Sequence, residues 1–509
     1  MSPGSGPSTG VGQLSDGMPN GTETPGGPQA MEGPTVPGML MGGAGTSGAV
    51  DPGAPMFEQD DPNLHPPDSS FERVEIPTPA PNAMALDIDD QDRVYVLGRA
   101  GSLKIWYPGE GRVVDAGTLP VFSGNEDGAL SITLDPNFSS NGWAYIYYSS
   151  NQASQNVLSR FQITADKLDL ASESILLTVP EDRAAMNHAA GSTDFDSQGN
   201  LYLATGDNTN PFQSNGFSPH DERAGRQVFD AQRTAANSRD LRGKILRITP
   251  TADGAYGIPA GNLFSQGGDE GAPEIYTMGD RNPFRIAVDT TKDWLYWGEV
   301  GPDAADAAEN LATRGPRGYD EFNQAKSAGF FGWPYCIGNN VPYVHVEFAT
   351  LTPQGGPFNC GAPVNDSPNN TGAKQLPPAQ PAWIAYSYGV SPYPALTRGG
   401  GRSALIADIY RWKPGGSVNK LPRYYDGSVL LMEYVRGLMA EVRTDDAGAI
   451  QSVEPFLNSF QWRNVIQARI SPSGVLHVAQ YGGGTGSNVL TGGTSTVYRI
   501  NYVGSSTPE

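Results

Sequence analysis

The stretch Thr193-Asp-Phe-Asp-Ser-Gln-Gly-Asn-Leu-Tyr-Leu203 carries the pattern that decides the fold. A short alternating segment leads into the turn residues Ser, Gln, Gly and Asn, and a run of Leu and Tyr follows directly. Alternation of apolar and polar residues predicts a strand with one buried face, and Gly-Asn at the connection predicts a tight turn. The stretch is therefore expected to form a β-hairpin.

The same pattern occurs five more times along the chain, at unequal spacing. These copies begin at Ala85, Ser131, Arg285, Ala404 and Ala468. A hairpin repeated in this way is typical of propeller blades that carry long loop insertions. We therefore predict an all-β chain that forms a six-bladed β-propeller over residues 68–509.

The composition supports this fold class and argues against several partners. The 64 glycines, 43 prolines and 22 tyrosines suit short strands and tight turns better than long helices. The formal net charge of −21 argues against binding to nucleic acid or to an anionic membrane surface. We therefore expect an all-β chain that does not bind nucleic acid.

Residues 1–67 differ in composition from the rest of the chain. They are rich in Gly, Pro, Ser and Thr and hold almost no aromatic residue, so they cannot bury enough apolar surface to fold alone. We predict a disordered leader. It could tether the following domain to a membrane, or it could be an inert tail.

Two long insertions, residues 207–242 and 303–403, interrupt the strand pattern. Loops of this length usually carry function, and in a propeller they would gather on one face around the central channel. The second insertion holds the only two cysteines, Cys336 and Cys360. A bond between them would contribute roughly 3 kcal/mol and would indicate an oxidising compartment, whereas two unrelated buried thiols are the alternative.

Five segments, in a fixed order, resemble a known family. They are Asn187-His-Ala-Ala-Gly-Ser with Thr205-Gly-Asp-Asn, Leu241-Arg-Gly-Lys, Gly279-Asp-Arg-Asn-Pro-Phe, Gly301-Pro-Asp with Tyr319-Asp-Glu-Phe-Asn and Phe331-Gly-Trp-Pro, and Arg463-Asn-Val-Ile. The set resembles the soluble glucose/sorbosone dehydrogenases, whose known enzymes use pyrroloquinoline quinone (PQQ) and calcium. Tyr335-Cys-Ile-Gly-Asn-Asn and Leu376-Pro-Pro-Ala-Gln-Pro-Ala also resemble a bacterial branch often found beside ThuA-like and carbohydrate-binding modules.

The resemblance implies two catalytic residues, His188 and Arg281. His188 matches the family's base, and imidazole is suited to taking a hydroxyl proton because it titrates near neutral pH. Arg281 matches a cation that stabilises charge on the reduced cofactor. The alternatives are a structural histidine held by a loop carbonyl and an arginine that closes a turn beside a carboxylate.

The resemblance also implies two calcium regions. Gly301 and Pro302 match the segment whose backbone carbonyls hold the active-site ion, and calcium accepts oxygen ligands in variable number. Asp320 and Glu321 match a second, structural calcium region. A plain turn and a solvated acidic pair are the respective alternatives.

Six further residues are expected to contact the cofactor. They are Glu126, Asn282, Tyr386, Tyr388, Arg436 and Arg463. The chain departs from the glucose enzymes at Val435, where they have a lysine, and at Gln461, where they have an arginine. Those cations hold the PQQ carboxylates, so their loss weakens cofactor binding unless Arg436 or Arg398 compensates.

The resemblance therefore predicts an extracytoplasmic oxidoreductase. A sugar or related alcohol would be oxidised by hydride transfer to PQQ with calcium, and an external electron acceptor would reoxidise the cofactor. A non-redox, calcium-stabilised propeller that binds a glycan or a partner protein is the alternative. A calcium-dependent lactonase would need an ordered Asn/Glu set lining the channel, and no such set is visible.

Overall fold

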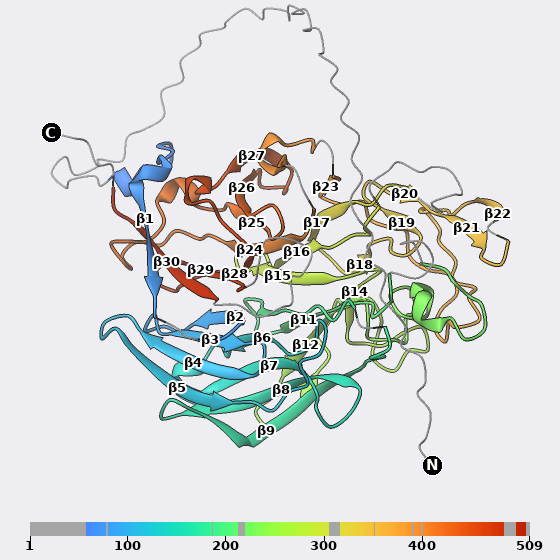
Figure 1. Cartoon of the computed structure of the whole chain (residues 1–509), viewed down its shortest axis with the longest axis horizontal. Helices are drawn as coiled ribbons and strands as arrows, with labels where there is room; N and C mark the ends of the chain where they lie inside the picture. Colours follow the sequence, from blue (N-terminus) through green and yellow to red (C-terminus); the bar gives the residue numbers. More distant parts are fainter. Residues whose placement is uncertain are drawn as a thin grey trace, which may run out of the picture. The chain divides into compact units, whose positions relative to one another are not determined.

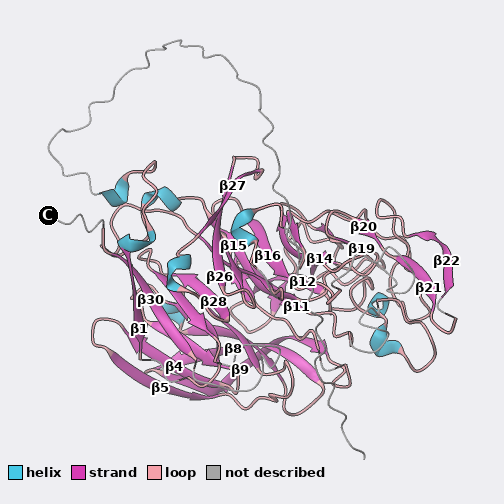
Figure 2. Ribbon diagram, turned by 45° about the horizontal axis from the view of Figure 1, so that its top comes forward, coloured by secondary structure: helices cyan, strands magenta, loops and turns pink. Residues whose placement is uncertain are grey.

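The computed structural model describes residues 58–77, 80–185, 187–211, 219–304, 316–350, 352–388, 391–398, 401–482 and 495–504. The chain divides into residues 1–55 and a compact unit of residues 56–509. Within the described part of this unit most regular structure is β-strand (Figure 2). It is accompanied by one α-helical turn, α1 (Phe138–Asn141), and seven short 3₁₀ turns. No helix in the described ranges is long and apolar enough to cross a membrane. The predicted all-β class is confirmed.

Six sheets form the blades of a propeller, numbered here along the chain. Blade 1 contains β2 (Ala83–Ile88), β3 (Val94–Gly98), β4 (Ser102–Tyr107) and β5 (Arg112–Thr118). Blade 2 contains β6 (Ala129–Leu134), β7 (Trp143–Ser149), β8 (Gln155–Thr164) and β9 (Lys167–Pro180). Blade 3 contains β10 (Thr193–Phe195), β11 (Leu201–Thr205), β12 (Lys244–Pro250) and β14 (Ile275–Met278), extended by β13 (Tyr256–Gly257) and β18 (Gly329–Phe330).

The remaining three blades complete the ring. Blade 4 contains β15 (Pro283–Asp289), β16 (Trp294–Glu299), β17 (Asp320–Ala325) and β23 (Ile384–Tyr386). Blade 5 contains β24 (Ala404–Ile409), β25 (Val429–Glu433), β26 (Leu438–Thr444) and β27 (Ile450–Pro455). Blade 6 contains β28 (Val465–Ile470), β29 (Leu476–Gln480), β30 (Thr496–Tyr502) and β1 (Phe71–Ile76). The predicted six-bladed propeller is therefore confirmed.

Blade 6 closes the ring by pairing the two ends of the domain. Strand β1 runs antiparallel to β30, in a register from Phe71 opposite Tyr502 to Ile76 opposite Val497. Figure 1 shows β1 (blue) alongside β30 (red). The hydrogen bonds of this pair join the start of the domain to its end, so the ring has no open seam at this point.

The inner strands β2, β6, β10, β15, β24 and β28 surround the channel, and Arg285 of β15 fastens several of them together. Its side chain is fully buried, at 0% exposure. The guanidinium donates to the carbonyls of Met84 (2.6 Å), Gly191 (2.8 Å) and Ile466 (2.9 Å), which belong to three other blades or their connections. Burial, with the charge of Arg469 adding to it, lowers the pKa of Arg285 to about 9. The carbonyl acceptors are therefore needed to hold this charge.

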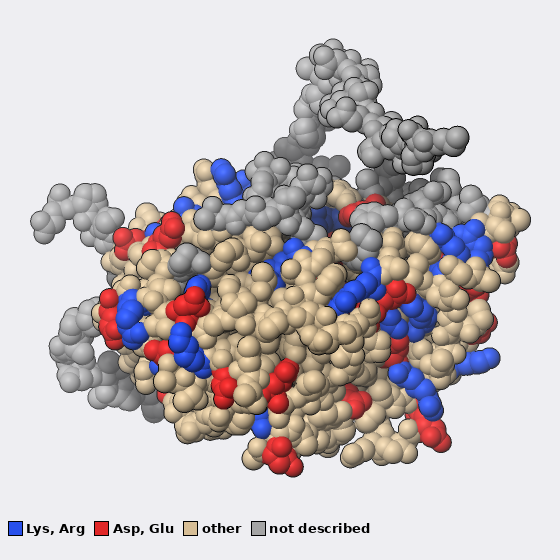
Figure 3. All heavy atoms as spheres, turned by 60° about the horizontal axis from the view of Figure 1, so that its bottom comes forward, with Lys and Arg blue, Asp and Glu red and all other residues tan. Residues whose placement is uncertain are grey.

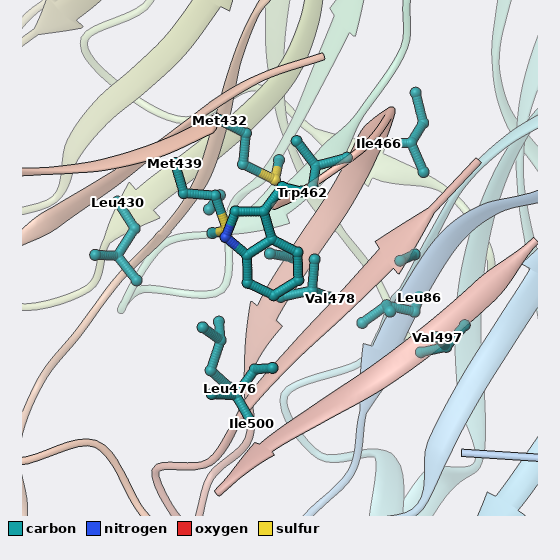
Figure 4. Packing of buried hydrophobic residues seen from close by; sticks show 14 of the residues in the cluster. Leu86, Leu430, Met432, Met439, Trp462, Ile466, Leu476, Val478, Val497 and Ile500 are labelled. Atoms are coloured by element: carbon teal, nitrogen blue, oxygen red, sulfur yellow. The ribbon is translucent and has the colours of Figure 1, made fainter. Parts of the chain in front are cut away.

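The largest apolar cluster lies where blades 5, 6 and 1 meet. In Figure 4 the indole of Trp462 lies among side chains from β25, β26, β28, β29, β30 and β2. Met432 and Met439 are unbranched and fit around the ring, while Val478 and Ile500 come from neighbouring strands of blade 6. Closing the ring thus also builds its main core.

The described structure begins at Glu58, ten residues before the predicted start of the propeller domain at residue 68. Residues 1–57 are outside the described ranges, so the disordered leader stays a prediction. From Glu58–Asp60, a 3₁₀ turn, the chain packs on the propeller. The Gln59 amide donates to the Lys420 carbonyl (2.7 Å), and the His65 ring meets the Tyr424 ring edge-on, with centroids 4.7 Å apart.

The second insertion forms two small hairpins beside blade 3 (Figure 1). They are β19 (Cys336–Ile337) with β20 (Val341–Pro342) and β21 (Val344–Glu347) with β22 (Thr352–Pro357). A disulfide joins Cys336 to Cys360, as predicted. On the face shown in Figure 3, acidic and basic side chains are interspersed.

Replacing Arg285 tests its role as a fastener. We expect Arg285→Met to lower the free energy of unfolding by roughly 3–5 kcal/mol, because buried carbonyls lose their charged donor. Arg112→Met is the matched control, because Arg112 is an exposed guanidinium paired with Glu110, and we expect a change of about 0.5 kcal/mol or less. Urea denaturation of both variants measures the difference, and equal small effects would contradict the role.

Candidate active site

The candidate residues come from equivalent connections of different blades. Asn282 and Arg463 precede the innermost strands β15 and β28, and His188 precedes β10. Asp207 and Gly301 follow second strands, β11 and β16. In a propeller both kinds of connection open at the same end of the channel. Residues scattered over about 280 positions are therefore brought to one mouth.

His188 is held by a buried carboxylate. Its Nδ1 lies 2.7 Å from Oδ1 of Asp207, which is 0% exposed, and this oxygen also accepts the Thr209 backbone N–H. The other carboxylate oxygen, Oδ2, accepts the Trp333 indole N–H at 2.7 Å. Because a carboxylate only accepts, Nδ1 donates. Within the described residues Nε2 has no hydrogen-bond partner, so it is the nitrogen left to receive a proton.

His188 itself is buried, at 5% exposure. Its backbone adopts a left-handed conformation with φ of 57°. Gly206 makes this close packing possible, because a Cβ there would lie 1.9 Å from the His188 carbonyl oxygen. The ring is thus fixed in place rather than free on a loop.

The His188 loop and the Arg281 loop contact each other directly. The Asp207 backbone N–H donates to the Arg281 carbonyl (2.8 Å), and the Ala190 N–H donates to Oδ1 of Asn282 (3.1 Å). The Arg281 guanidinium donates to the Val300 carbonyl (2.6 Å). The predicted base and the predicted cation therefore lie at one site.

Glu299, which sequence analysis did not single out, organises the Arg281 loop. Its Oε1 accepts the backbone N–H groups of Arg281 (2.7 Å) and Asn282 (2.5 Å). Burial raises the pKa of Glu299 well above its usual range, and the nearby charge of Asp280 adds to the rise. The two backbone hydrogen bonds that Oε1 accepts offset part of the free-energy cost of burying this carboxyl group.

A small cavity of about 10 Å³ lies beside this loop, lined among others by Gly301 and Glu321. Three buried oxygens of lining residues have no partner in the described part of the chain, namely Asp280 Oδ1, Glu299 Oε2 and Asn323 Oδ1. Burial raises the pKa of both Asp280 and Glu321 to about 7. The space suits one water-sized guest, and oxygen acceptors suit a cation or a proton donor.

The four predicted metal residues have different surroundings. The Pro302 carbonyl accepts from Arg402 (2.7 Å) and from the Ala304 N–H (2.8 Å). Asp320 forms a buried ion pair with Arg402 at 2.9 Å and accepts the N–H groups of Gly301 and Ala404. These contacts tie blade 4 to blade 5. Across the described ranges, no three acidic, histidine or cysteine side chains are placed to hold a metal by themselves.

Two of the predicted cofactor residues are committed to structural contacts. The Arg436 guanidinium donates to the carbonyls of Ser387, Leu396 and Gly401. Tyr386 is buried, stacks on Phe322 with centroids 5.8 Å apart, and donates to Glu433. Few donors of Arg436 remain for a cofactor, and no face of Tyr386 is exposed at a channel mouth. Their cofactor roles stay predictions.

The other cofactor candidates remain more accessible. Arg463 is exposed, and its side chain forms no ion pair or hydrogen bond with the described residues. Tyr388 is half-buried and donates to Asp303 (3.0 Å), with the Arg402 guanidinium 4.2 Å from its ring centre. Glu126 accepts from the Asn187 amide (3.3 Å) and the Ala189 N–H (3.2 Å), so it supports the His188 loop.

A second cavity, of about 470 Å³, lies elsewhere and is larger than the one beside Gly301. It is lined by Asp87, Asp194, Asp408 and Arg469, which sit near the ends of inner strands, where the first hairpin turns begin. In the propeller topology these turns open at the end opposite His188. Volume alone would select this cavity, but the histidine, arginine and carboxylate partners described above are at the other mouth.

Asp207 and Trp333 were part of quoted segments but were given no role from the sequence. Asp207 follows a strand in a Thr-Gly-Asp-Asn run, and an aspartate at such a position is typical of an ordinary turn. Trp333 lies 126 positions away. A separation of 19 residues does not by itself indicate that a histidine and an aspartate form a hydrogen bond. That contact becomes visible only when the strands of blade 3 are placed in space.

Comparison with known proteins agrees with this arrangement. The model of the family Glucose / Sorbosone dehydrogenase matches residues 79–350, more than half of the chain. The fold and the ordered segments at the channel mouth define a dehydrogenase-type propeller. The chain belongs to the glucose/sorbosone dehydrogenase family.

Individual relatives match only part of their own length or share only the fold. Aldose sugar dehydrogenase YliI of Escherichia coli (strain K12) is 25% identical over 287 residues, covering 54% of this chain and 66% of YliI. Hedgehog-interacting protein of Homo sapiens is 26% identical over 223 residues, covering 40% of this chain and 29% of that protein. The PQQ-bound aldose sugar dehydrogenase of Streptomyces coelicolor has a similar fold, with TM-score 0.52, 19% identity, and coverage of 85% of this chain and 98% of that one.

The buried carboxyl groups of Glu299 and Glu321, beside the Arg281 loop, predict that the free energy of unfolding depends on pH. Their folded pKa values lie above the ordinary 4.5, so the folded state binds extra protons and loses stability as pH rises from about 4.5 through 7. In Glu299→Gln the amide nitrogen can replace the protonated oxygen. We expect this variant to lose roughly 1–3 kcal/mol less than the parent between pH 5 and pH 8.

Urea denaturation at the two pH values, with chelator present, measures this difference. Glu110→Gln is the control, because Glu110 is exposed and, among the described residues, forms its ion pair with Arg112 alone. The interpretation fails if Glu299→Gln and Glu110→Gln show the same pH dependence as the parent.

Proposed function

We propose that this protein is an extracytoplasmic dehydrogenase that oxidises a sugar or related alcohol with PQQ and calcium. The observation that carries the proposal is the pair His188 and Asp207, which leaves one ring nitrogen without a partner among the described residues, beside Arg281 at one channel mouth. Family membership and the dehydrogenase relatives support the same reaction class. A propeller alone would not, because the fold hosts many functions.

His188 acts as the base. Asp207 fixes the ring with Nδ1–H toward the carboxylate, so Nε2 presents its lone pair to the substrate hydroxyl. As the proton arrives at Nε2, the buried negative charge of Asp207 stabilises the imidazolium that forms. Because the Asp207 backbone N–H donates to the Arg281 carbonyl, the carboxylate that holds the base stays in register with the cation.

PQQ, when bound, supplies the hydride acceptor. Arg463, which is unpaired among the described residues, offers a guanidinium for a carboxylate. The amide nitrogen of Asn282 is left for a cofactor oxygen because its Oδ1 already accepts the Ala190 N–H. Arg281, on the same loop as Asn282, would stabilise the negative charge that develops on the cofactor. These residues fit an anionic, oxygen-rich group, although Val435 and Gln461 supply none of the family's cations.

Calcium fits the cavity beside Gly301. The three unpartnered oxygens of Asp280, Glu299 and Asn323 would be satisfied by a hard cation, with backbone carbonyls and bound cofactor completing its shell. Asp320 is less suited, since its oxygens already hold Arg402 and two backbone N–H groups. The disulfide supports an oxidising, extracytoplasmic location.

A second candidate is a non-redox propeller that binds a partner protein or glycan. Two observations favour it. The chain also matches a Hedgehog-interacting protein, and Val435, which stands where the glucose enzymes have a lysine, is 45% exposed. Because the Arg436 guanidinium donates to three backbone carbonyls, fewer cations are left to bind the carboxylates of PQQ.

Adding PQQ and calcium to the purified protein separates the two candidates. We expect an absorbance change on binding that a sugar or alcohol substrate bleaches, with an artificial acceptor restoring it. His188→Gln should keep the binding change and lower the bleaching rate by roughly 10²–10⁴-fold, because the base is gone.

His345→Gln is the matched control, because His345 is half-exposed on β21. In this variant the cofactor absorbance should be bleached at the parent rate. Absence of any PQQ-dependent change in the parent, across a panel of aldoses and alcohols, would favour the binding protein. Equal rates in the two histidine variants would remove His188 from the chemistry.

A further inference from the structure

The indole of Trp333 contacts both halves of the proposed site. Its N–H donates to Oδ2 of Asp207 (2.7 Å), the carboxylate that holds His188. Its ring lies beside Arg281, with the guanidinium carbon 5.7 Å from the ring centre. One side chain from the second insertion therefore touches the partner of the base and the neighbouring cation.

The insertion holds Trp333 firmly. The Trp333 backbone N–H donates to the Gly279 carbonyl (3.0 Å), two residues before Arg281. The preceding Gly332 has φ of 100°, and a Cβ there would lie 2.9 Å from the Cys336 carbonyl oxygen. Cys336 is bonded to Cys360, and the Tyr343 ring packs edge-on against the indole. Backbone turn, disulfide and ring packing thus fix the direction of the indole N–H.

No neighbouring cation replaces this donor. Lys244 lies close enough to interact electrostatically with Asp207, but its ammonium donates to the carbonyls of Thr234, Ala235 and Arg242. The Arg242 guanidinium is paired with Asp240 at 2.6 Å. Within the described residues, Oδ2 of Asp207 therefore depends on Trp333.

We propose that Trp333 is a positioning residue for His188, an inference that rests on the base role proposed above. With Oδ2 held by the indole, Oδ1 points to Nδ1 of His188 and keeps the ring in the tautomer whose Nε2 is free. Without the indole N–H, a buried carboxylate oxygen is unpaired, and the carboxylate turns away from the imidazole to find another donor.

Trp333→Phe isolates the hydrogen bond. Phenylalanine keeps an aromatic ring beside Arg281 and removes only the N–H and part of the ring. We expect kcat to fall about 10–100-fold, as for other second-sphere partners, while KM changes less than about threefold. In ¹⁵N NMR of labelled histidine, the neutral His188 ring should show Nδ1–H in the parent and a tautomer mixture in the variant.

Trp106→Phe is the matched control. Trp106 is also buried, but its Nε1 has no partner among the described residues and it lies on β4 of blade 1. Loss of an indole there should leave kcat, KM and the His188 spectrum unchanged. A purely structural role for Trp333 would instead lower thermal stability without changing the tautomer.

The two readouts separate the inference from the proposed function. A changed tautomer in Trp333→Phe without turnover in any protein, parent included, would overturn the dehydrogenase and keep the positioning role. Turnover in the parent with unchanged kcat and spectrum in Trp333→Phe would overturn the positioning role. Should Trp333→Phe not fold, the parent's Trp333 indole proton decides: slow solvent exchange supports the hydrogen bond, and exchange as fast as an exposed indole overturns it.

Discussion

A buried guanidinium at the channel wall is the interaction on which the rest of the propeller depends. Arg285 lies on an inner strand of blade 4 and donates to carbonyls from blade 1, blade 6 and the approach to blade 3. Hydrogen bonds from a charged donor in a dry interior are strong, and each acceptor would otherwise be an unpaired buried carbonyl. The inner ring is thus fixed across its diameter as well as around its edge, where β1 pairs with β30.

A rigid ring explains how so few side chains build the site. His188, Asp207 and Arg281 come from connections of blades 3 and 4, whose inner strands Arg285 helps to fix. Backbone hydrogen bonds between these connections set their spacing, and the disulfide-closed insertion adds Trp333. Positions of this kind are more accurate than those on free loops, which is what proton transfer requires.

The sequence predicted the propeller because hairpin patterning repeats and survives unequal loops. The resemblance singled out His188 and Arg281, and the structure brings them together because equivalent connections of the blades share one face. The sequence could not predict which groups form hydrogen bonds with each polar side chain. Arg436 and Asp320 read as ligands for a cofactor and a metal, yet the structure commits them to backbone carbonyls and to Arg402. Asp207 and Glu299 were overlooked, since their partners are set by packing between blades rather than by spacing in the chain.

The central claim is that the mouth formed by His188 and Arg281, and not the larger cavity at the opposite end, binds a redox cofactor. A crystal structure of the protein grown with PQQ and calcium tests it most directly. We expect the planar cofactor at that mouth, within hydrogen-bond distance of Arg463 and Asn282, with Nε2 of His188 facing it. Cofactor density beside Asp194 and Arg469, or none at saturating PQQ, would contradict it.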